Sequence, residues 1–175
     1  MKDPTLVAIV ETIQDHKVVG LNDQYLFKKA GSKYAKQAWE PHQDNAYVKS
    51  EHGAYTQPHI FLDDSDKENG GLYYYSGSHF EGILPNSYKE SWKEPIGADG
   101  ISRPGRVCEV PEQYSRRDIV APMGSICLQH GEIIHGSYPN LSDDRDRQQY
   151  SVAYLNKDAS YNSGYNSRKI PIPLD

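Results

Sequence analysis

Residues 39–44, Trp39-Glu40-Pro41-His42-Gln43-Asp44, place a histidine and an aspartate one residue apart. In an extended segment, side chains at positions i and i+2 project from the same face, so His42 and Asp44 could reach one ion together. An imidazole nitrogen and a carboxylate oxygen on one face are two of the three ligands in the facial triad of non-haem Fe(II). The tripeptide alone is weak evidence, because a surface histidine beside a solvated aspartate is its commoner explanation.

The composition of the chain is that of a globular domain. It has 175 residues, of which 37% are hydrophobic and 25% charged, enough for one domain with a core. A net charge of −5 argues against nucleic acid or an anionic membrane as partner. No apolar run approaches the ~20 residues of a membrane span, and the N-terminus lacks a signal-peptide pattern. Cys108 and Cys127 match no disulfide framework or zinc motif. We therefore expect a cytoplasmic location.

The chain pattern predicts one short helix followed by many short strands. Asp3 and Pro4 supply an N-cap and a first-turn proline ahead of the apolar positions 6, 7, 10 and 13. Apolar and alternating runs predict strands at residues 18–27, 42–48, 55–62, 72–75, 126–128 and 148–155, with 126–128 buried. Dense turn signals separate these runs. The pattern favours a mainly β fold of the sandwich or jelly-roll type.

The chain contains no internal repeat and no linker, so we expect a single domain over residues 1–175. Residues 80–117 are rich in glycine, proline and charge with little periodicity, which predicts a lid-like loop. Residues 156–175 are expected to form a polar, extended C-terminal tail.

His135 is the best candidate for a third ligand. Among the histidines (16, 42, 52, 59, 79, 130 and 135), it is expected to end an apolar strand that contains Ile133 and Ile134, and it precedes a glycine that lets the backbone turn near a bound group. Two imidazoles and one carboxylate would leave three positions of an octahedral Fe(II) open for a bidentate 2-oxo acid and dioxygen. The distal carboxylate of such an acid needs a fixed cation, for which Arg145 and Arg147 are the candidates. Both arginines lie in a charged turn, where surface ion pairs are the ordinary alternative.

Three blocks of the chain resemble the phytanoyl-CoA dioxygenase family, whose members are Fe(II)/2-oxoglutarate oxygenases with a double-stranded β-helix, a cupin-like jelly roll. The blocks are Trp39 to Val48, Asn69-Gly70-Gly71-Leu72…Ser76-Gly77-Ser78-His79, and Ile134-His135-Gly136-Ser137-Tyr138-Pro139-Asn140…Arg147. They occur in the family's order. The resemblance implies His42, Asp44 and His135 as iron ligands. Family members usually carry a helical segment before the first core strand, so the chain is expected to be a minimal or a truncated version.

The resemblance also implies residues that contact the 2-oxoglutarate cosubstrate. The family's anchoring arginine lies about eleven residues beyond the distal histidine, between Arg145 and Arg147. Arg147 is preferred, because Tyr154 then stands where the family usually has a tyrosine, and Arg145 is the alternative. Ser137 is expected to add a hydroxyl. A cosubstrate-contacting lysine is expected at Lys29, or at Lys28 beside it. Gln43 matches the His-Gln-Asp of the family, and His59 stands where the family often has a tryptophan near the cosubstrate.

The activity expected from the resemblance is hydroxylation of a small molecule with Fe(II) as cofactor. 2-Oxoglutarate and O2 are consumed and succinate and CO2 are released, with ascorbate as a possible in vitro reductant. The carboxylate of Asp44 favours hydroxylation, because the family's halogenating relatives lack it. The abundant tyrosines and the basic Arg103 and Arg106 suggest a polar or anionic substrate. Two alternatives stay open: a cupin-like metalloprotein, such as an isomerase or a 2-oxoglutarate-independent dioxygenase, and an inactive jelly-roll binding module.

Overall fold

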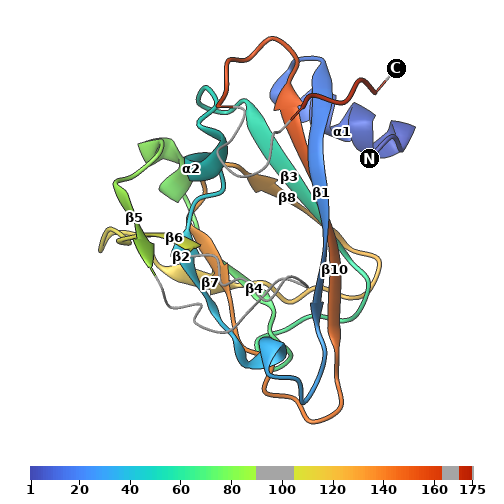
Figure 1. The fold of residues 1–175 in the computed structure, drawn as a ribbon, viewed down its shortest axis with the longest axis vertical. Coiled ribbons are helices and arrows are strands. Elements are labelled where there is room, and N and C mark those ends of the chain that lie inside the picture. Colours follow the sequence, from blue (N-terminus) through green and yellow to red (C-terminus); the bar gives the residue numbers. More distant parts are fainter. Residues whose placement is uncertain (90–104, 163–169, 175) are drawn as a thin grey trace.

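The computed structural model describes residues 1–89, 105–162 and 170–174, and these form two facing antiparallel sheets with a short N-terminal helix (Figure 1). One sheet has the order β1-β10-β3-β8, the other β2-β9-β4-β7, and β5 pairs with β6. The strands are β1 (Val18–Lys28), β2 (Trp39–His42), β3 (Tyr55–Phe61), β4 (Leu72–Tyr75), β5 (Asn86–Lys89), β6 (Gly105–Cys108), β7 (Arg116–Asp118), β8 (Ile126–His130), β9 (His135–Ser137) and β10 (Arg147–Asn156). The helical elements are α1 (Pro4–Gln14), η1 (Tyr34–Lys36), α2 (Asn45–Val48) and η2 (Ser78–Glu81). The mainly β jelly-roll prediction is confirmed.

Helix α1 begins where the sequence predicts. The Asp3 side chain accepts a hydrogen bond of 2.9 Å from the Leu6 amide, which satisfies one of the free N–H groups of the first turn. Leu6 and Val10 are buried and pack against Val18 of β1 and Tyr154 of β10. The helix thus covers one end of the first sheet, on its outer side (Figure 1).

The apolar core lies at the two ends of the space between the sheets. One cluster includes Val48, Tyr55 and Leu155, and another includes Phe61 and Leu72. Between them the sheets bury an unusual number of polar side chains on β3, β8 and β10: Gln57, His59, Gln129, Gln149 and Ser151. Buried polar groups must be hydrogen-bonded to be tolerated. Their concentration in the middle of the barrel therefore marks a polar interior.

Two predicted strands differ from the structure. Residues 42–48 were expected to be extended, but β2 ends at His42, and Asn45–Val48 form a helical turn. The Asn45 side chain accepts from the Ser50 amide at 2.9 Å, which closes this turn. Residues 126–128 were expected to be buried, but β8 is an edge strand, and Ile126 and Leu128 are 47% and 36% exposed.

The segment 80–117 is more ordered than a loop. It contains the end of η2, the paired strands β5 and β6, and the first two residues of β7, while residues 90–104 lie outside the described part. In the tail, Ile172 forms an isolated bridge with Gly20, and Leu174 packs near α1. In its described part, the tail therefore contacts β1 at Ile172.

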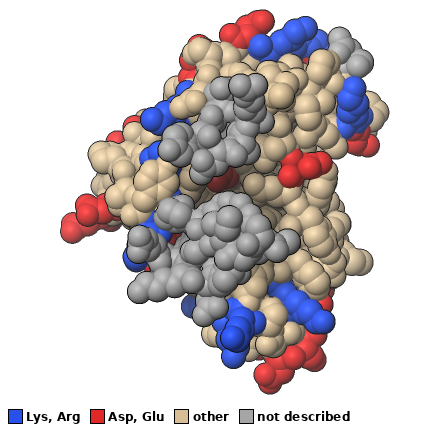
Figure 2. Space-filling model, viewed as in Figure 1, with Lys and Arg blue, Asp and Glu red and all other residues tan. Residues whose placement is uncertain are grey.

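On the face shown in Figure 2, basic and acidic side chains are interspersed along the margins of the molecule. No helix of the described part combines the length and apolarity needed to cross a bilayer. Both cysteines are free.

Candidate metal centre and adjoining cavity

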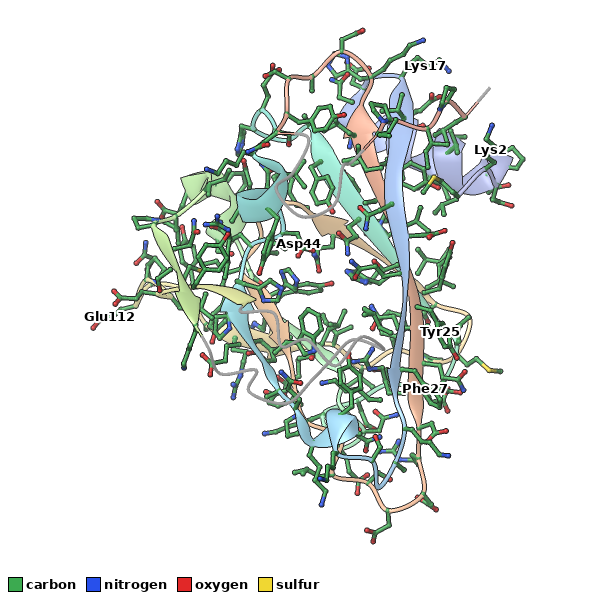
Figure 3. The ribbon with its side chains drawn as sticks, viewed as in Figure 1. Lys2, Lys17, Tyr25, Phe27, Asp44 and Glu112 are labelled. Carbon is green, nitrogen blue, oxygen red and sulfur yellow. The ribbon has the colours of Figure 1, made fainter. Side chains whose placement is uncertain are left out.

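The candidate metal ligands come from two paired strands and the turn after one of them. His42, the last residue of β2, lies opposite His135, the first residue of β9. His42 Nε2 is 3.6 Å from Asp44 Oδ1, and His135 Nε2 is 3.6 Å from Asp44 Oδ2. One donor atom from each side chain lies within 4.8 Å of the others, which suits a single ion. In Figure 3 the Asp44 side chain points into the space between the sheets.

The backbone at Asp44 and at His135 differs from the extended conformation and strand end that the sequence predicts. Asp44 has helical backbone angles, φ −66° and ψ −34°, so it meets His42 through a turn rather than through strand alternation. His135 begins a strand rather than ending one. Gly136 is required by the neighbouring strands, since a Cβ there would lie 2.3 Å from Tyr73 Oη and 2.4 Å from the Trp39 carbonyl oxygen.

Backbone carbonyl groups orient both imidazole rings. His42 Nδ1 lies 2.7 Å from the Glu40 carbonyl oxygen, and His135 Nδ1 lies 3.1 Å from that of Ile133. A carbonyl oxygen only accepts, so each Nδ1 carries the proton and each Nε2 offers its lone pair. Metal-binding histidines are generally held by such outer hydrogen bonds.

The charge states at the centre also suit a metal. Burial lowers the pKa of His135 to about 3, so its ring is neutral at neutral pH. Burial by itself would raise the pKa of Asp44, but His135, His42, His59 and a hydrogen bond from Gln129 outweigh it and lower the pKa below the usual aspartate value. The centre therefore contains a carboxylate and at least one neutral imidazole, which is the donor chemistry of a divalent iron site.

An open cavity of about 460 Å³ adjoins the three ligands. Gln24 and Leu26 of β1 line it, whereas Tyr25 and Phe27, at alternate positions, lie on the outer side of the strand (Figure 3). The cavity wall also includes Ser137 and Arg147.

Arg147 is a buried cation on the wall of this cavity. Its side chain is 3% exposed and donates to the Gly70 carbonyl and to Gln149 Oε1, both at 3.2 Å. Burial lowers the pKa of Arg147 to about 10. Within the described residues the guanidinium forms no ion pair.

Lys28 is a second buried cationic side chain beside Arg147. It is 1% exposed, and Nζ donates to Ser137 Oγ and the Gln37 carbonyl, both at 2.9 Å, and to the Tyr138 carbonyl. Burial, together with the charge of Arg147, lowers the pKa of Lys28 to about 6. The ion pairs of the described residues do not include Lys28 either. A buried guanidinium and a buried lysine, neither paired with a carboxylate of the described residues, fit a site for an anionic ligand that would also favour the charged form of the lysine.

Two of the predicted cosubstrate residues lie away from the cavity. Lys29 is exposed, because alternation along β1 turns Lys28 inward and its neighbour outward. Arg145 makes two 2.9 Å hydrogen bonds to Asp66 and one of 2.7 Å to Glu68 at the surface. The structure therefore corrects these two positions and leaves Lys28 and Arg147 beside the cavity.

The remaining predicted residues divide between the cavity and its support. Ser137 and His59 line the cavity. Gln43 is buried but turned away, with Nε2 donating to the Gly82 and Glu132 carbonyls at 2.8 and 2.6 Å. Gln43 thus braces the turn that carries Asp44.

Sequence analysis did not predict three polar residues of this region, the buried Gln129 and Gln149 and the half-buried Tyr34. Gln129 donates to Asp44 Oδ2 at 2.7 Å, Gln149 contacts Arg147, and the Tyr34 side chain lines the cavity. Alternation from Arg147 along β10 would have pointed to Gln149. No comparable signal marks Gln129, whose position depends on the pairing of β3 with β8.

Residues 1–148 match the family model described as phytanoyl-CoA dioxygenase (PhyH). A phytanoyl-CoA dioxygenase of Arabidopsis thaliana is 27% identical over 173 residues, which cover 95% of this chain and 56% of that protein. The apo structure of the non-heme monooxygenase ThoJ has a TM-score of 0.72 at 19% identity, covering 98% of this chain and 58% of that one. The epimerase SnoN, in complex with Fe3+, alpha ketoglutarate and nogalamycin RO, has a TM-score of 0.69 at 19% identity, covering 99% and 68%. The chain spans about half the length of the curated relatives it matches.

Proposed function

The chain belongs to the phytanoyl-CoA dioxygenase family, and we propose that it is an Fe(II)- and 2-oxoglutarate-dependent dioxygenase that hydroxylates a small molecule. The observation that carries the proposal is one cavity whose wall contains both a His-Asp-His set and a buried arginine that forms no ion pair with the described residues. The first suits a divalent iron and the second a carboxylate. The cytoplasmic location expected from the sequence stays part of this proposal.

In this proposal His42, Asp44 and His135 hold the iron through the two Nε2 atoms and one carboxylate oxygen. When bound, Fe(II) with 2-oxoglutarate supplies the oxidation of a substrate C–H bond by O2, with release of succinate and CO2. The protein's own task is to place these groups. Glu40 and Ile133 fix the tautomers of the two histidines through their carbonyl groups, so both rings are already set for binding.

Arg147 would bind the distal carboxylate of 2-oxoglutarate, and Lys28 would stand behind it. Ser137 lines the cavity and lies 2.9 Å from Lys28 Nζ, so its hydroxyl can connect the lysine to the ligand. A planar guanidinium with several donors favours a carboxylate held by two parallel hydrogen bonds. This cationic end selects for a dicarboxylate over a simple 2-oxo acid.

For the substrate we propose a polar or anionic small molecule. Arg106 lies with its guanidinium 4.3 Å from the centre of the Tyr88 ring and donates to Tyr88 Oη at 2.8 Å. Tyr47 accepts from the Arg106 amide at 2.6 Å, which fixes β6 close to the turn that carries Asp44. Arg103, the other basic residue expected to contribute, lies outside the described residues.

The experiment is succinate formation from 2-oxoglutarate under air, with Fe(II) and ascorbate, compared between wild type and variants. His135→Ala should abolish turnover through loss of metal, and Arg147→Ala should abolish it with metal binding retained. Arg145→Ala, a surface arginine two residues away, is the matched control and should behave as wild type.

The same measurements separate the alternatives. Metal binding by wild type without binding of 2-oxoglutarate would favour a cupin-like isomerase or a 2-oxoglutarate-independent dioxygenase. Absence of metal binding would favour a binding module. Turnover of 2-oxoglutarate that survives in His135→Ala would refute the metal assignment.

A further inference from the structure

A row of buried polar side chains connects Arg147 to Asp44. Arg147 Nη1 donates to Gln149 Oε1 at 3.2 Å, and Gln149 Nε2 contacts His59 Nδ1. His59 Nε2 then lies 3.0 Å from Gln129 Oε1, and Gln129 Nε2 donates to Asp44 Oδ2 at 2.7 Å. The three linking residues are at most 3% exposed, and they come from the neighbouring strands β10, β3 and β8.

The two ends of this row fix the direction of every hydrogen bond in it. A guanidinium can only donate, so Gln149 must turn its oxygen to Arg147 and its NH2 to His59. His59 Nδ1 therefore accepts, and its proton is on Nε2, which donates to the oxygen of Gln129. The NH2 of Gln129 is left facing Asp44, and a carboxylate can only accept. Both ends thus require the same orientation, from Arg147 to Asp44.

We propose that Gln149, His59 and Gln129 act as positioning residues, a one-way hydrogen-bond relay that couples the cosubstrate-binding arginine to the metal-binding carboxylate. The inference rests on the proposed function, in which Arg147 binds 2-oxoglutarate and Asp44 binds the metal. A charge at each end of a buried chain polarises the neutral links between them, because the surroundings screen little.

The relay determines how Asp44 can bind a metal. Gln129 engages Oδ2, whereas Oδ1 accepts no hydrogen bond from the described residues. Asp44 is thereby held to bind through one oxygen. A carboxylate that bound through both would occupy one of the three positions that a bidentate cosubstrate and O2 need.

The surroundings of His59 support the neutral ring that the relay requires. Burial lowers the pKa of His59 to about 4, so the imidazole carries a single proton at neutral pH. That proton is on Nε2 by the geometry above.

The first test is the affinity of the full chain for Co(II), without 2-oxoglutarate, by calorimetry and visible absorption. Gln129→Leu should weaken binding about tenfold, as loss of an outer hydrogen bond to a ligand commonly does. Gln149→Leu should weaken it severalfold although Gln149 touches no ligand. Thr56→Val removes a buried hydroxyl of β3 that bonds to Gln14 of α1 on the other face of the sheet, and its Co(II) affinity should stay within about twofold of wild type.

The double variant Gln129→Leu/Gln149→Leu distinguishes a relay from two separate defects. Within a relay, breaking the second link costs nothing further, so the double variant should match Gln129→Leu within about twofold. Independent effects would multiply and overturn the proposal. Equal losses in Gln149→Leu and the Thr56→Val control would also overturn it.

The second test needs neither a variant nor a metal. Nitrogen-15 NMR of histidine-labelled wild type should find His59 neutral at pH 7, with the proton on Nε2. A proton on Nδ1, or a doubly protonated ring, would overturn the relay. If wild type binds Co(II) but Gln149→Leu leaves the affinity unchanged, the relay fails and the oxygenase proposal stands. If wild type binds no metal, both fail.

Discussion

Replacement of Lys28 by methionine should change the pH dependence of folding stability. Lys28 is 1% exposed, and its pKa is lowered to about 6 by burial and by the charge of Arg147. In the unfolded chain the same amine titrates near its ordinary value of 10.5. Methionine has a similar length and no charge, so it removes this titration while filling the same space.

The direction and size of this pH dependence follow from the linkage between proton binding and folding. Between about pH 6 and pH 10.5 the unfolded state binds more protons than the folded state, so the free energy of unfolding rises with pH. A lysine neutral in the folded state and charged in the unfolded state gives a slope of at most about 1.4 kcal/mol per pH unit. Below about pH 6 both states are protonated, and the burial penalty of the lysine is fully present.

Loss of the Lys28 hydrogen bonds destabilises the methionine variant, and this cost changes little between pH 6 and pH 9. In Lys28→Met the carbonyl groups of Gln37 and Tyr138 lose their partner, which costs about 1–3 kcal/mol for each buried acceptor. The variant should therefore be clearly less stable than wild type near pH 9. Its deficit should shrink, and can reverse, towards pH 6.

The assay is urea unfolding of wild type and Lys28→Met from pH 6 to pH 9, with the difference in unfolding free energy plotted against pH. Lys29→Met is the matched control, because the neighbouring side chain is exposed. Its difference from wild type should be flat. A flat difference for Lys28→Met as well would refute a neutral, buried lysine.

Three further outcomes follow. Binding of 2-oxoglutarate to the Co(II) protein at pH 8 should take up as much as one proton, because a bound carboxylate raises the pKa of Lys28 again. Calorimetry in buffers of different ionisation enthalpy measures this proton uptake, and Lys28→Met should abolish it. Gly136→Ala should lower both thermal stability and Co(II) affinity, because the added Cβ would lie 2.3 Å from Tyr73 Oη. An unchanged Co(II) affinity would contradict the need for close strand contact at His135. Arg147→Lys should weaken 2-oxoglutarate binding about tenfold without abolishing it, because the charge is kept and the paired donors are lost; equal affinity in titration would argue against a two-point carboxylate contact.

The metal ligands could be predicted because their residue types carry the chemistry. His42, Asp44 and His135 were selected from donor type and spacing, and the structure brings their donor atoms within 4.8 Å. The backbone that brings them together was predicted less well. Asn45 closes a helical turn directly after Asp44, and a side chain that bonds to a residue five positions away leaves no periodic signal.

For the basic residues near the cavity, strand alternation alone predicts only part of what the structure shows. Arg147 and Lys28 both face inward, but only the phase of β1, fixed by its pairing with β10, decides between Lys28 and Lys29. A slip of one residue would exchange the two faces of a strand. The row from Gln149 to Gln129 depends on two such pairings at once, β10 with β3 and β3 with β8, so no single segment of the sequence could reveal it.

The charges around the cavity explain why metal and cosubstrate sites should act together. Asp44 is held ionised beside a neutral His135, so the metal end has a negative charge that a divalent cation would overcompensate. Arg147 stays buried without a counter-ion among the described residues, and a dicarboxylate would supply one. Each ligand would thus offset an electrostatic cost of burying these charged groups, and each should stabilise the fold in proportion to its occupancy. The relay joins these two ends through neutral groups alone, so it can transmit orientation between them without adding a charge of its own.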